Sequence, residues 1–294
     1  MGASIKAGIR ERAQGNQLLS LELSVARVEK LSPGFSRVVL TGPALDEYRD
    51  PRPADAFKLM LPPKPGAAVD GPVRGESGLP EWNGGEQPVL RAFTVRRFDS
   101  AARELTLDVA RHEQGVSIDW LAAVRPGDTV ALSGMRPEWA VADGVHDHIL
   151  IGDGTALPAI AAIIESLDPA DTVTAYLTVP DPADIALVPA HPNLALHRVD
   201  DIAEAAGHTP APIAAGRRAQ VWIAAEAGKV RRVRTDAVHH WGIDRADLLA
   251  RAYWKLGSTS TDNDSATLVK YQEAIAGGQD IHDPALAETI ELGA

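Results

Sequence analysis

Hydrophobic residues in the first half of the chain alternate with polar residues or form short runs, which is typical of β-strands. Leu21, Leu23 and Val25, for example, are separated by polar residues. We predict six strands, bounded by turn residues, at positions 21–28, 38–40, 57–61, 89–95, 105–109 and 129–132. A helix is expected at 117–124. Short strands in this arrangement predict a small antiparallel β-barrel or sandwich.

The pattern changes near residue 143. A continuous apolar run at 148–151 leads into a Gly-rich turn and then into a stripe of apolar residues with helical spacing, Ile160, Ile163, Ile164 and Leu167. Further strands are predicted at 172–179, 194–199 and 221–225. A second helix then places Val230, Val233, Ala237 and Trp241 on one face. Strands that alternate with helices predict a parallel sheet covered on both sides, as in Rossmann-like α/β domains.

These patterns divide the chain into four segments. We expect a mobile N-terminal arm at 1–20, a β-domain at 21–143, an α/β domain at 144–257 and a helical tail at 258–294. The tail helix is predicted from Leu268, Tyr271 and Ile275, which share one face. Residues 62–88 are rich in Pro, Gly and charged side chains, so we expect a surface insertion there.

Composition narrows the possible classes of protein. A length of 294 residues favours about two domains. The absence of cysteine excludes disulfides, Cys-ligated zinc and Cys-ligated iron–sulfur clusters. The net charge of −11 disfavours broad nucleic-acid binding. The longest apolar run, residues 156–164, falls short of the roughly 20 residues that a membrane helix needs. We therefore expect a cytoplasmic protein with no membrane insertion.

Three segments carry residues suited to binding an anionic or aromatic ligand. In Arg91-Ala92-Phe93-Thr94, the Arg can hold a pyrophosphate, the aromatic ring can face a ring system and the Thr can hydrogen-bond a ring edge. His112 precedes a turn, Gly115-Val116-Ser117, that opens a helix, and helix N-termini attract anions. Each pattern is equally compatible with a solvated strand or a hydrated helix end.

The third segment, residues 152–158, lies between a strand and a helix, where α/β sheets bind ligands. It contains neither a G-x-G-x-x-G fingerprint nor the Lys of a P-loop. The chain also has no G-x-S-x-G elbow and no H-E-x-x-H motif. The spacing of its nine histidines defines no metal-ligand set.

Taken in order, these segments resemble the siderophore-interacting proteins, flavin-dependent ferric-siderophore reductases of the ferredoxin–NADP reductase superfamily. RAFTVRRFD at 91–99 is similar to that family's R-T-Y-T-V-R-R-F-D, and GDGTALPAI at 152–160 is similar to its G-D-E-T-A-L-P-A-I. The segments beginning at His112, Val221 and Ala252 resemble H-x-x-x-G-P-A-x-x-W, V-W-V-A-G-E and G-Y-W-R-x-G. The resemblance covers about residues 21–257.

The resemblance implies a fold and a set of cofactor-binding residues. It implies a six-stranded antiparallel β-barrel that binds FAD, at 21–143, followed by a Rossmann-like NAD(P)-binding domain, at 144–257. By this resemblance Arg91 holds the flavin phosphates, Phe93 packs on the isoalloxazine and Thr94 hydrogen-bonds near its reactive nitrogen. The remaining positions are Ala92, Val109, His112, Val116 and Ser117 around FAD, and Gly152, Asp153, Thr155, Ala156 and Glu226 on the side of the NADH or NADPH.

The same resemblance implies a role in iron acquisition. Electrons pass from NAD(P)H through FAD to siderophore-bound Fe(III), and Lys58, Arg136 and Lys255 are the basic residues that match those facing the ferric siderophore. Three positions depart from the family's pattern: Phe93 replaces a Tyr, Val116 a Pro and Gly154 a Glu. Two alternatives stay open, a general flavin or ferredoxin reductase on the same fold and a non-catalytic siderophore-binding protein.

Overall fold

The computed structural model describes residues 3–15, 19–62, 69, 73–74, 80–81, 88–113, 115–258 and 260–293. The chain divides into two compact units, one formed by residues 16–138 and the other by residues 1–15 and 139–294. Of the predicted insertion, β4 (Val73–Arg74) and β5 (Pro80–Glu81) form a two-stranded antiparallel ladder. Most of the rest of the insertion lies outside the described residues.

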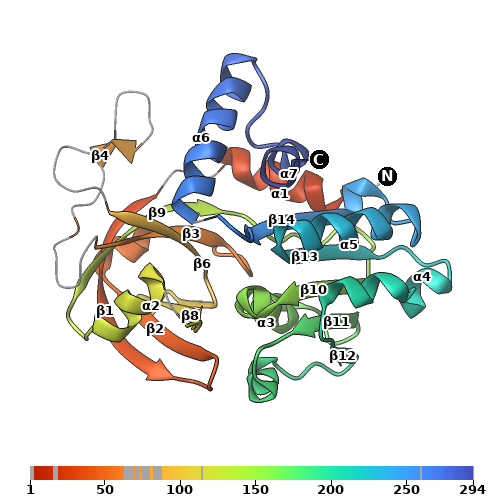
Figure 1. Ribbon diagram of the computed structural model, residues 1–294, viewed down its shortest axis with the longest axis horizontal. Helices are drawn as coiled ribbons and strands as arrows, with labels where there is room; N and C mark the ends of the chain where they lie inside the picture. Colours follow the sequence, from red (N-terminus) through yellow and green to blue (C-terminus); the bar gives the residue numbers. More distant parts are fainter. Residues whose placement is uncertain are drawn as a thin grey trace. The chain divides into compact units, whose positions relative to one another are not determined.

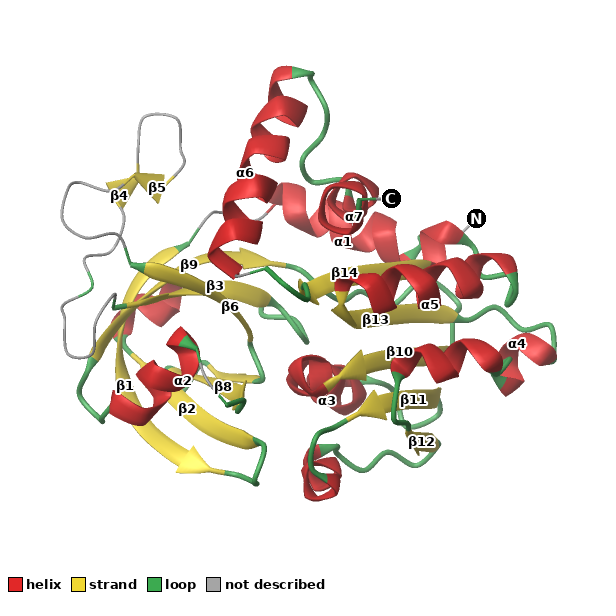
Figure 2. Ribbon diagram, viewed as in Figure 1, coloured by secondary structure: helices red, strands yellow, loops and turns green. Residues whose placement is uncertain are grey.

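The unit formed by residues 16–138 is built on one antiparallel sheet (Figure 2). The six predicted strands are all present, and a short strand, β7, joins them at one edge. The strand order is β6-β3-β9-β1-β2-β8-β7. The bounds are β1 Ser20–Lys30, β2 Phe35–Thr41, β3 Ala56–Leu61, β6 Val89–Thr94, β7 Arg97–Asp99, β8 Glu104–Ala110 and β9 Thr129–Arg136.

This sheet curls so that its two edges approach each other. Strands β6 and β7 follow one another in sequence but lie at opposite edges. Arg96, one of the two residues between them, donates its backbone N–H to the carbonyl of Thr106 in β8 at 2.9 Å. The alternating residues Leu21, Leu23 and Val25 are buried inside. The predicted small antiparallel barrel is therefore confirmed as a curled, barrel-like sheet. Short helices η1 (Pro43–Glu47) and α2 (Val116–Ala123) complete the unit.

The second unit contains a parallel sheet with the order β12-β11-β10-β13-β14 (Figure 1). The predicted α/β architecture is confirmed, although the edge strand β14 was not among the predicted strands. The bounds are β10 Asp147–Asp153, β11 Thr172–Thr178, β12 Leu194–Arg198, β13 Gln220–Glu226 and β14 Leu248–Trp254.

The helices of this unit cover both faces of the sheet. The chain leaves β10 toward β11 through α3 (Leu157–Ser166), and leaves β13 in the opposite direction through α5 (Ala227–His239). Since crossovers between parallel strands are right-handed, the two helices lie on opposite faces. Val230 and Val233 of α5 are buried against β10 and β13, as their helical spacing predicts. Shorter helices are η2 Gly154–Ala156, η3 Pro182–Leu187, η4 Ile202–Gly207, α4 Ala211–Ala214 and η5 Arg245–Asp247.

The N-terminal segment differs from the mobile arm expected from the sequence. Residues Ile5–Gly15 form helix α1, in which Ile5 and Ile9 are buried. The Lys6 ammonium lies 2.9 Å from the carboxylate of Glu288 in α7 (Pro284–Leu292). The arm prediction was wrong because polar residues dominate α1, and its few apolar residues gain burial from helices that come much later in the sequence.

The boundary between the units also has a physical explanation. It falls after Glu138, whereas the sequence places the change near residue 143. Trp139 is buried and packs edge-on against His148 of β10, with ring centroids 5.8 Å apart, so it belongs to the α/β unit. Beyond residue 257, α6 (Ser260–Ala276) agrees with the predicted tail helix. Within the described part of the chain, no helix is both long and apolar enough to cross a membrane.

Candidate functional site

Strand β6 presents Arg91 and Phe93 on one face. Phe93 pairs with Phe57 of β3, and their ring centroids are 6.4 Å apart. Trp120 of α2 lies on its other side, at 6.5 Å. Phe93 therefore connects β6 to the start of the unit's main helix. Arg91 is half-buried and donates from Nη1 to the carbonyl of Leu90 at 2.8 Å.

The opposite face of the same strands brings together residues that are distant in sequence. Thr94 of β6 and Arg136 of β9 both pair with Ala56 of β3. Lys58 lies two residues further along β3, so its side chain leaves the same face as these three residues. The structure thus places Lys58, Thr94 and Arg136 on one face of three adjacent strands, with Ala92, which is exposed, opposite Lys58.

Arg136 carries a counter-charge of its own. Its Nε is ion-paired with Oε1 of Glu138, whose side chain is fully buried, while the Arg136 side chain is 44% exposed. The negative charge of Glu138 offsets part of the positive charge that Arg136 offers to an external anion. Glu138 was not singled out from the sequence, because it belongs to none of the matching motifs.

The start of α2 is open to an external anion. Gly115 occupies the N-cap position with φ +134°, and none of the described side chains caps the helix. Val116 and Ser117 form the first turn and are half-buried. Their backbone N–H groups point out of the helix end, as do those of any first turn, and the helix dipole favours an anion there. Of the neighbouring predicted residues, Val109 is buried in β8 and His112 is exposed.

In the α/β unit, the predicted nucleotide-side residues lie at the point where the strand order reverses. The chain runs from β10 to one side of the sheet and from β13 to the other, and ligands of α/β sheets bind at such switch points. Gly152 is the penultimate residue of β10. A Cβ on Gly152 would lie 2.6 Å from the Cβ of Ala156 and 3.1 Å from the carbonyl oxygen of Ala224. Gly152 is therefore needed for close packing between the turn and β13.

The two carboxylates at the switch point cap the protein's own helices. Asp153 accepts hydrogen bonds from the backbone N–H and the hydroxyl of Thr155 at the start of η2. Glu226 accepts the backbone N–H groups of Gly228 at 2.7 Å and Lys229 at 3.0 Å at the start of α5. Neither helix start therefore offers an uncapped N-terminus to a phosphate, in contrast to α2.

The structure adds residues at this edge that the sequence reasoning missed. Thr178 ends β11, pairs with Asp153 in register, and has a buried hydroxyl without a hydrogen-bond partner in the described part of the chain. The indole Nε1 of Trp254 donates to Asp153 Oδ2 at 2.7 Å. Lys255, the third predicted basic residue, follows Trp254 directly and is exposed. The sequence signal for Trp254 was its presence in the closing aromatic motif.

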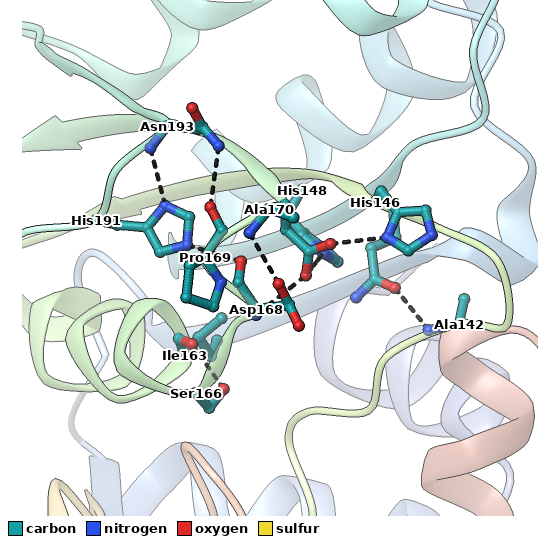
Figure 3. Close-up of polar contacts among 12 residues, drawn as sticks. Ala142, His146, His148, Ile163, Ser166, Asp168, Pro169, Ala170, His191 and Asn193 are labelled. Atoms are coloured by element: carbon teal, nitrogen blue, oxygen red, sulfur yellow. Dashed lines mark hydrogen bonds and ion pairs between the residues drawn. The ribbon is translucent and has the colours of Figure 1, made fainter.

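A histidine cluster lies at the opposite, amino-terminal end of the same strands (Figure 3). Asp171 contacts Nδ1 of His146 at 2.8 Å and Nε2 of His148 at 3.3 Å. Burial lowers the pKa of His148 below its usual value, although Asp171 opposes this change. Among the described residues, no group of three His, Asp or Glu side chains is placed to hold a metal ion.

Together, these features define a two-part molecule, a curled antiparallel sheet joined to a parallel α/β sheet, with ligand-binding features in both parts. The same fold is found in ferredoxin reductases, such as one from Neisseria gonorrhoeae that is 14% identical, with a TM-score of 0.53 over 80% of this chain and 99% of that one. Residues 24–139 match the siderophore-interacting FAD-binding domain and residues 145–257 match the siderophore-interacting protein domain. The chain belongs to the siderophore-interacting protein family, and FAD is the cofactor of its first domain.

Several characterised relatives and solved structures are similar to this chain. The NADPH-dependent ferric-chelate reductase of Escherichia coli is 34% identical over 152 residues, which cover 52% of this chain and 59% of that protein. The ferric vibriobactin reductase of Vibrio cholerae is 27% identical over 80% of this chain and 89% of its own length. A siderophore utilization protein from T. fusca superposes with a TM-score of 0.74, at 29% identity, over 83% of this chain and 95% of that one.

The residues of the β unit fit the cofactor that the family match assigns to it. The uncapped start of α2 suits a pyrophosphate, and the half-buried Arg91 supplies a cation on the strand whose Phe93 contacts the same helix. In the α/β unit, the unpartnered hydroxyl of Thr178 suits a polar ligand at the carboxyl edge of the sheet. Within the described part of the chain, the first turn of α2 has no side-chain cap and the Thr178 hydroxyl has no hydrogen-bond partner.

Proposed function

We propose that this protein is a ferric-siderophore reductase that takes electrons from NADH or NADPH and passes them, through FAD, to siderophore-bound Fe(III). The observation that carries the proposal is the match of both siderophore-interacting domains, in order, along 24–139 and 145–257. The names of the relatives from Escherichia coli and Vibrio cholerae describe reductases of ferric chelates. The absence of cysteine is compatible with a reducing compartment, and we propose the cytoplasm.

The reaction balances without an acid or base from the protein. One nicotinamide donates a hydride, which carries two electrons, and two ferric ions each accept one. The products are the oxidised nucleotide, one proton and two ferrous ions. FAD, when bound, converts between the two-electron donor and the one-electron acceptor. Oxygen-rich siderophores hold ferrous ion far less tightly than ferric ion, so reduction releases the metal.

The protein's part in this reaction is to bind and orient. In the β unit, we propose that Arg91 and the first turn of α2, with Val116 and Ser117, hold the phosphates of FAD. Phe93 and Thr94 lie on the two faces of β6, next to these groups, and we propose that both contact the flavin. We propose that the other predicted residues, Ala92, Val109 and His112, complete the FAD-binding site. We propose that Gly152, Asp153, Thr155, Ala156 and Glu226 shape the nucleotide side of the α/β unit.

We propose that Lys58, Arg136 and Lys255 attract the ferric chelate. Lys58 and Arg136 leave one face of β3 and β9, and Lys255 is exposed on the turn after β14. Basic side chains suit anionic chelates in a protein whose net charge is −11. Reversing Lys58 and Lys255 to Glu is expected to weaken the binding of an anionic chelate and to leave the FAD content intact.

The test is the visible absorption spectrum of the purified protein under anaerobic conditions. Flavin bands at roughly 380 and 450 nm should bleach when NADH or NADPH is added and should return when a ferric siderophore follows. A flavin that bleaches but is reoxidised equally well by soluble electron carriers, without dependence on the chelator, would identify a general flavin or ferredoxin reductase. A protein that takes up no FAD and still binds ferric chelates would be a non-catalytic binding protein.

A further inference from the structure

The turn that follows β14 is held by hydrogen bonds on both sides of Lys255. On one side, the indole Nε1 of Trp254 donates to Oδ2 of Asp153 at 2.7 Å. On the other, the backbone N–H of Leu256 donates to Oε1 of Glu226 at 3.3 Å. The turn closes through Gly257, which has φ +75°, and through a hydrogen bond from the Ser258 N–H to the Lys255 carbonyl at 3.3 Å.

The carboxylates of Asp153 and Glu226 each use their two oxygens for two different contacts. Oδ1 of Asp153 caps the turn after β10, and Oε2 of Glu226 caps α5. The second oxygen of each carboxylate is directed to the turn after β14 instead. The sheet order places β13 between β10 and β14, so the bond from Trp254 to Asp153 spans the end of one strand. The shift of register between β13 and β14, just before Trp254, makes this reach possible.

An arrangement of this kind is more than is needed to end a strand. Leu256 is 78% exposed and Trp254 is 40% exposed, so the turn buries its apolar surface only in part. A Lys side chain is flexible, and fixing the backbone on both sides restricts the volume that its ammonium can reach. Engaging both carboxylates with N–H donors also leaves them less able to attract the ammonium back to the protein.

We propose that Asp153, Glu226 and Trp254 are positioning residues that hold the turn so that Lys255 faces the anionic ferric chelate. The proposal rests on the proposed function and refines it, because it assigns the acidic residues at the switch point to the siderophore side through Lys255. It also predicts a substrate preference: anchoring matters for chelates with a net negative charge and has no effect on neutral ones.

The main experiment is a double-mutant cycle on the FAD-loaded protein with Trp254→Phe and Lys255→Gln. Phe keeps the aromatic ring but removes the N–H donor. Binding is measured by titration with a trianionic gallium tris-catecholate, which has the charge and shape of the ferric chelate but cannot be reduced. We expect each single variant to weaken binding about three- to fivefold and the double variant to bind no worse than Lys255→Gln alone.

A matched pair of Asp variants separates positioning from helix capping. Asn at 153 can still cap η2 but cannot accept the Trp254 indole N–H together with that cap. Asp181 caps η3 by accepting the N–H of Ala183 at 2.8 Å, in the same unit. We expect Asp153→Asn to weaken binding of the gallium chelate as Trp254→Phe does, and Asp181→Asn to leave binding unchanged. The indole N–H resonance of Trp254 should shift in Asp153→Asn.

The outcomes separate this proposal from the proposed function. A wild-type protein that binds the gallium chelate with the predicted dependence on Trp254, but reduces no ferric chelate, would support the positioning role and contradict the reductase. If Trp254→Phe instead raises the KM for NAD(P)H and leaves chelate binding unchanged, the positioning role is wrong. The same conclusion follows if Trp254→Phe weakens binding equally in the Lys255→Gln background, or if no chelate binds.

Discussion

The starts of helices in the two units treat negative charge in opposite ways. In the β unit, α2 begins at Gly115 and none of the described side chains caps it. In the α/β unit, the turn after β10 and helix α5 begin under the carboxylates of Asp153 and Glu226. A free helix N-terminus binds a phosphate readily, and a capped one does so only after the cap is displaced. The comparison therefore favours the start of α2 over the starts of η2 and α5 in our proposal that a helix end holds the phosphates of FAD.

The largest expected effect is the loss of FAD from Arg91→Gln. Arg91 is the cation on β6, the strand whose Phe93 contacts Trp120 of α2, and charge-assisted hydrogen bonds contribute about 1.5–3 kcal/mol each. We expect the FAD dissociation constant to rise about 10- to 100-fold, measured by absorbance and by titration of the apoprotein. Arg97→Gln is the matched control, because it changes the net charge equally and Arg97 is the exposed first residue of β7. Equal FAD affinity in the two variants would contradict the role of Arg91.

The next effect concerns the open helix start itself. In Gly115→Ala, the new Cβ would lie 3.0 Å from Cε1 of His112 in a backbone with φ +134°. We expect the free energy of unfolding to fall by about 1–2 kcal/mol and the FAD affinity to fall several-fold. Gly127→Ala is the control, because it has φ +94° but open space around the new Cβ. It should lose stability in denaturant unfolding and keep its FAD; loss of FAD from both variants would show that strain alone expels the cofactor.

A smaller effect is expected from Glu226→Gln, which removes the negative charge from the capped start of α5. Gln at 226 can still accept the N–H groups of α5 while the negative charge at the switch point is removed. We expect the KM for NAD(P)H to fall about two- to threefold at low ionic strength, and the difference to shrink as salt screens the charge. Glu204→Gln is the control, since Glu204 completes the capping box of η4, which follows the edge strand β12. An unchanged or higher KM would mean that Glu226 does not oppose the nucleotide's phosphates.

The sequence predicted the strands and the ligand-binding segments better than it predicted the contacts between them. Alternation identified β1, and a continuous apolar run identified β10, because both patterns follow from which faces are buried. The prediction did not include α1, whose Lys6 donates a hydrogen bond to Glu288, 282 residues away. The bond from Trp254 to Asp153 joins residues 101 positions apart and depends on a strand order that no local pattern encodes.

In the candidate site, too, the sequence indicated individual residues better than it indicated the contacts between them. The motifs indicated Arg91, Phe93 and the turn at Gly115 without any structure, because a strand fixes which side chains share a face. That Lys58 and Arg136 leave one face required the pairing of β3 with β9. The counter-charge of Glu138 on Arg136 and the unpartnered hydroxyl of Thr178 are visible only in three dimensions, since both depend on burial.

The smallest expected effect concerns His148, at the amino-terminal end of the α/β sheet. It tests whether ligand binding depends only on charges at the carboxyl end of the strands. Burial lowers the pKa of His148 in the folded state, with Asp171, Asp147 and His146 as its charged or titratable neighbours. A lowered pKa means that the unfolded chain binds the proton first. The stabilising effect of neutral His148 is therefore fully present above the unfolded pKa of about 6.5 and is lost as the pH falls below it.

We therefore expect His148→Gln to flatten the decline of the free energy of unfolding between about pH 6.5 and 5, by at most the one-proton slope of about 1.4 kcal/mol per pH unit. His191→Gln, in the partly exposed turn before β12, is the matched control for the loss of one histidine. Neither variant should alter the KM for NAD(P)H or the FAD content at pH 7.5, because this cluster contacts the amino ends of the strands. If His148→Gln changed the KM for NAD(P)H, the two ends of the sheet would be coupled. The charge of the histidine cluster would then affect Asp153 and Glu226 at the other end of the strands.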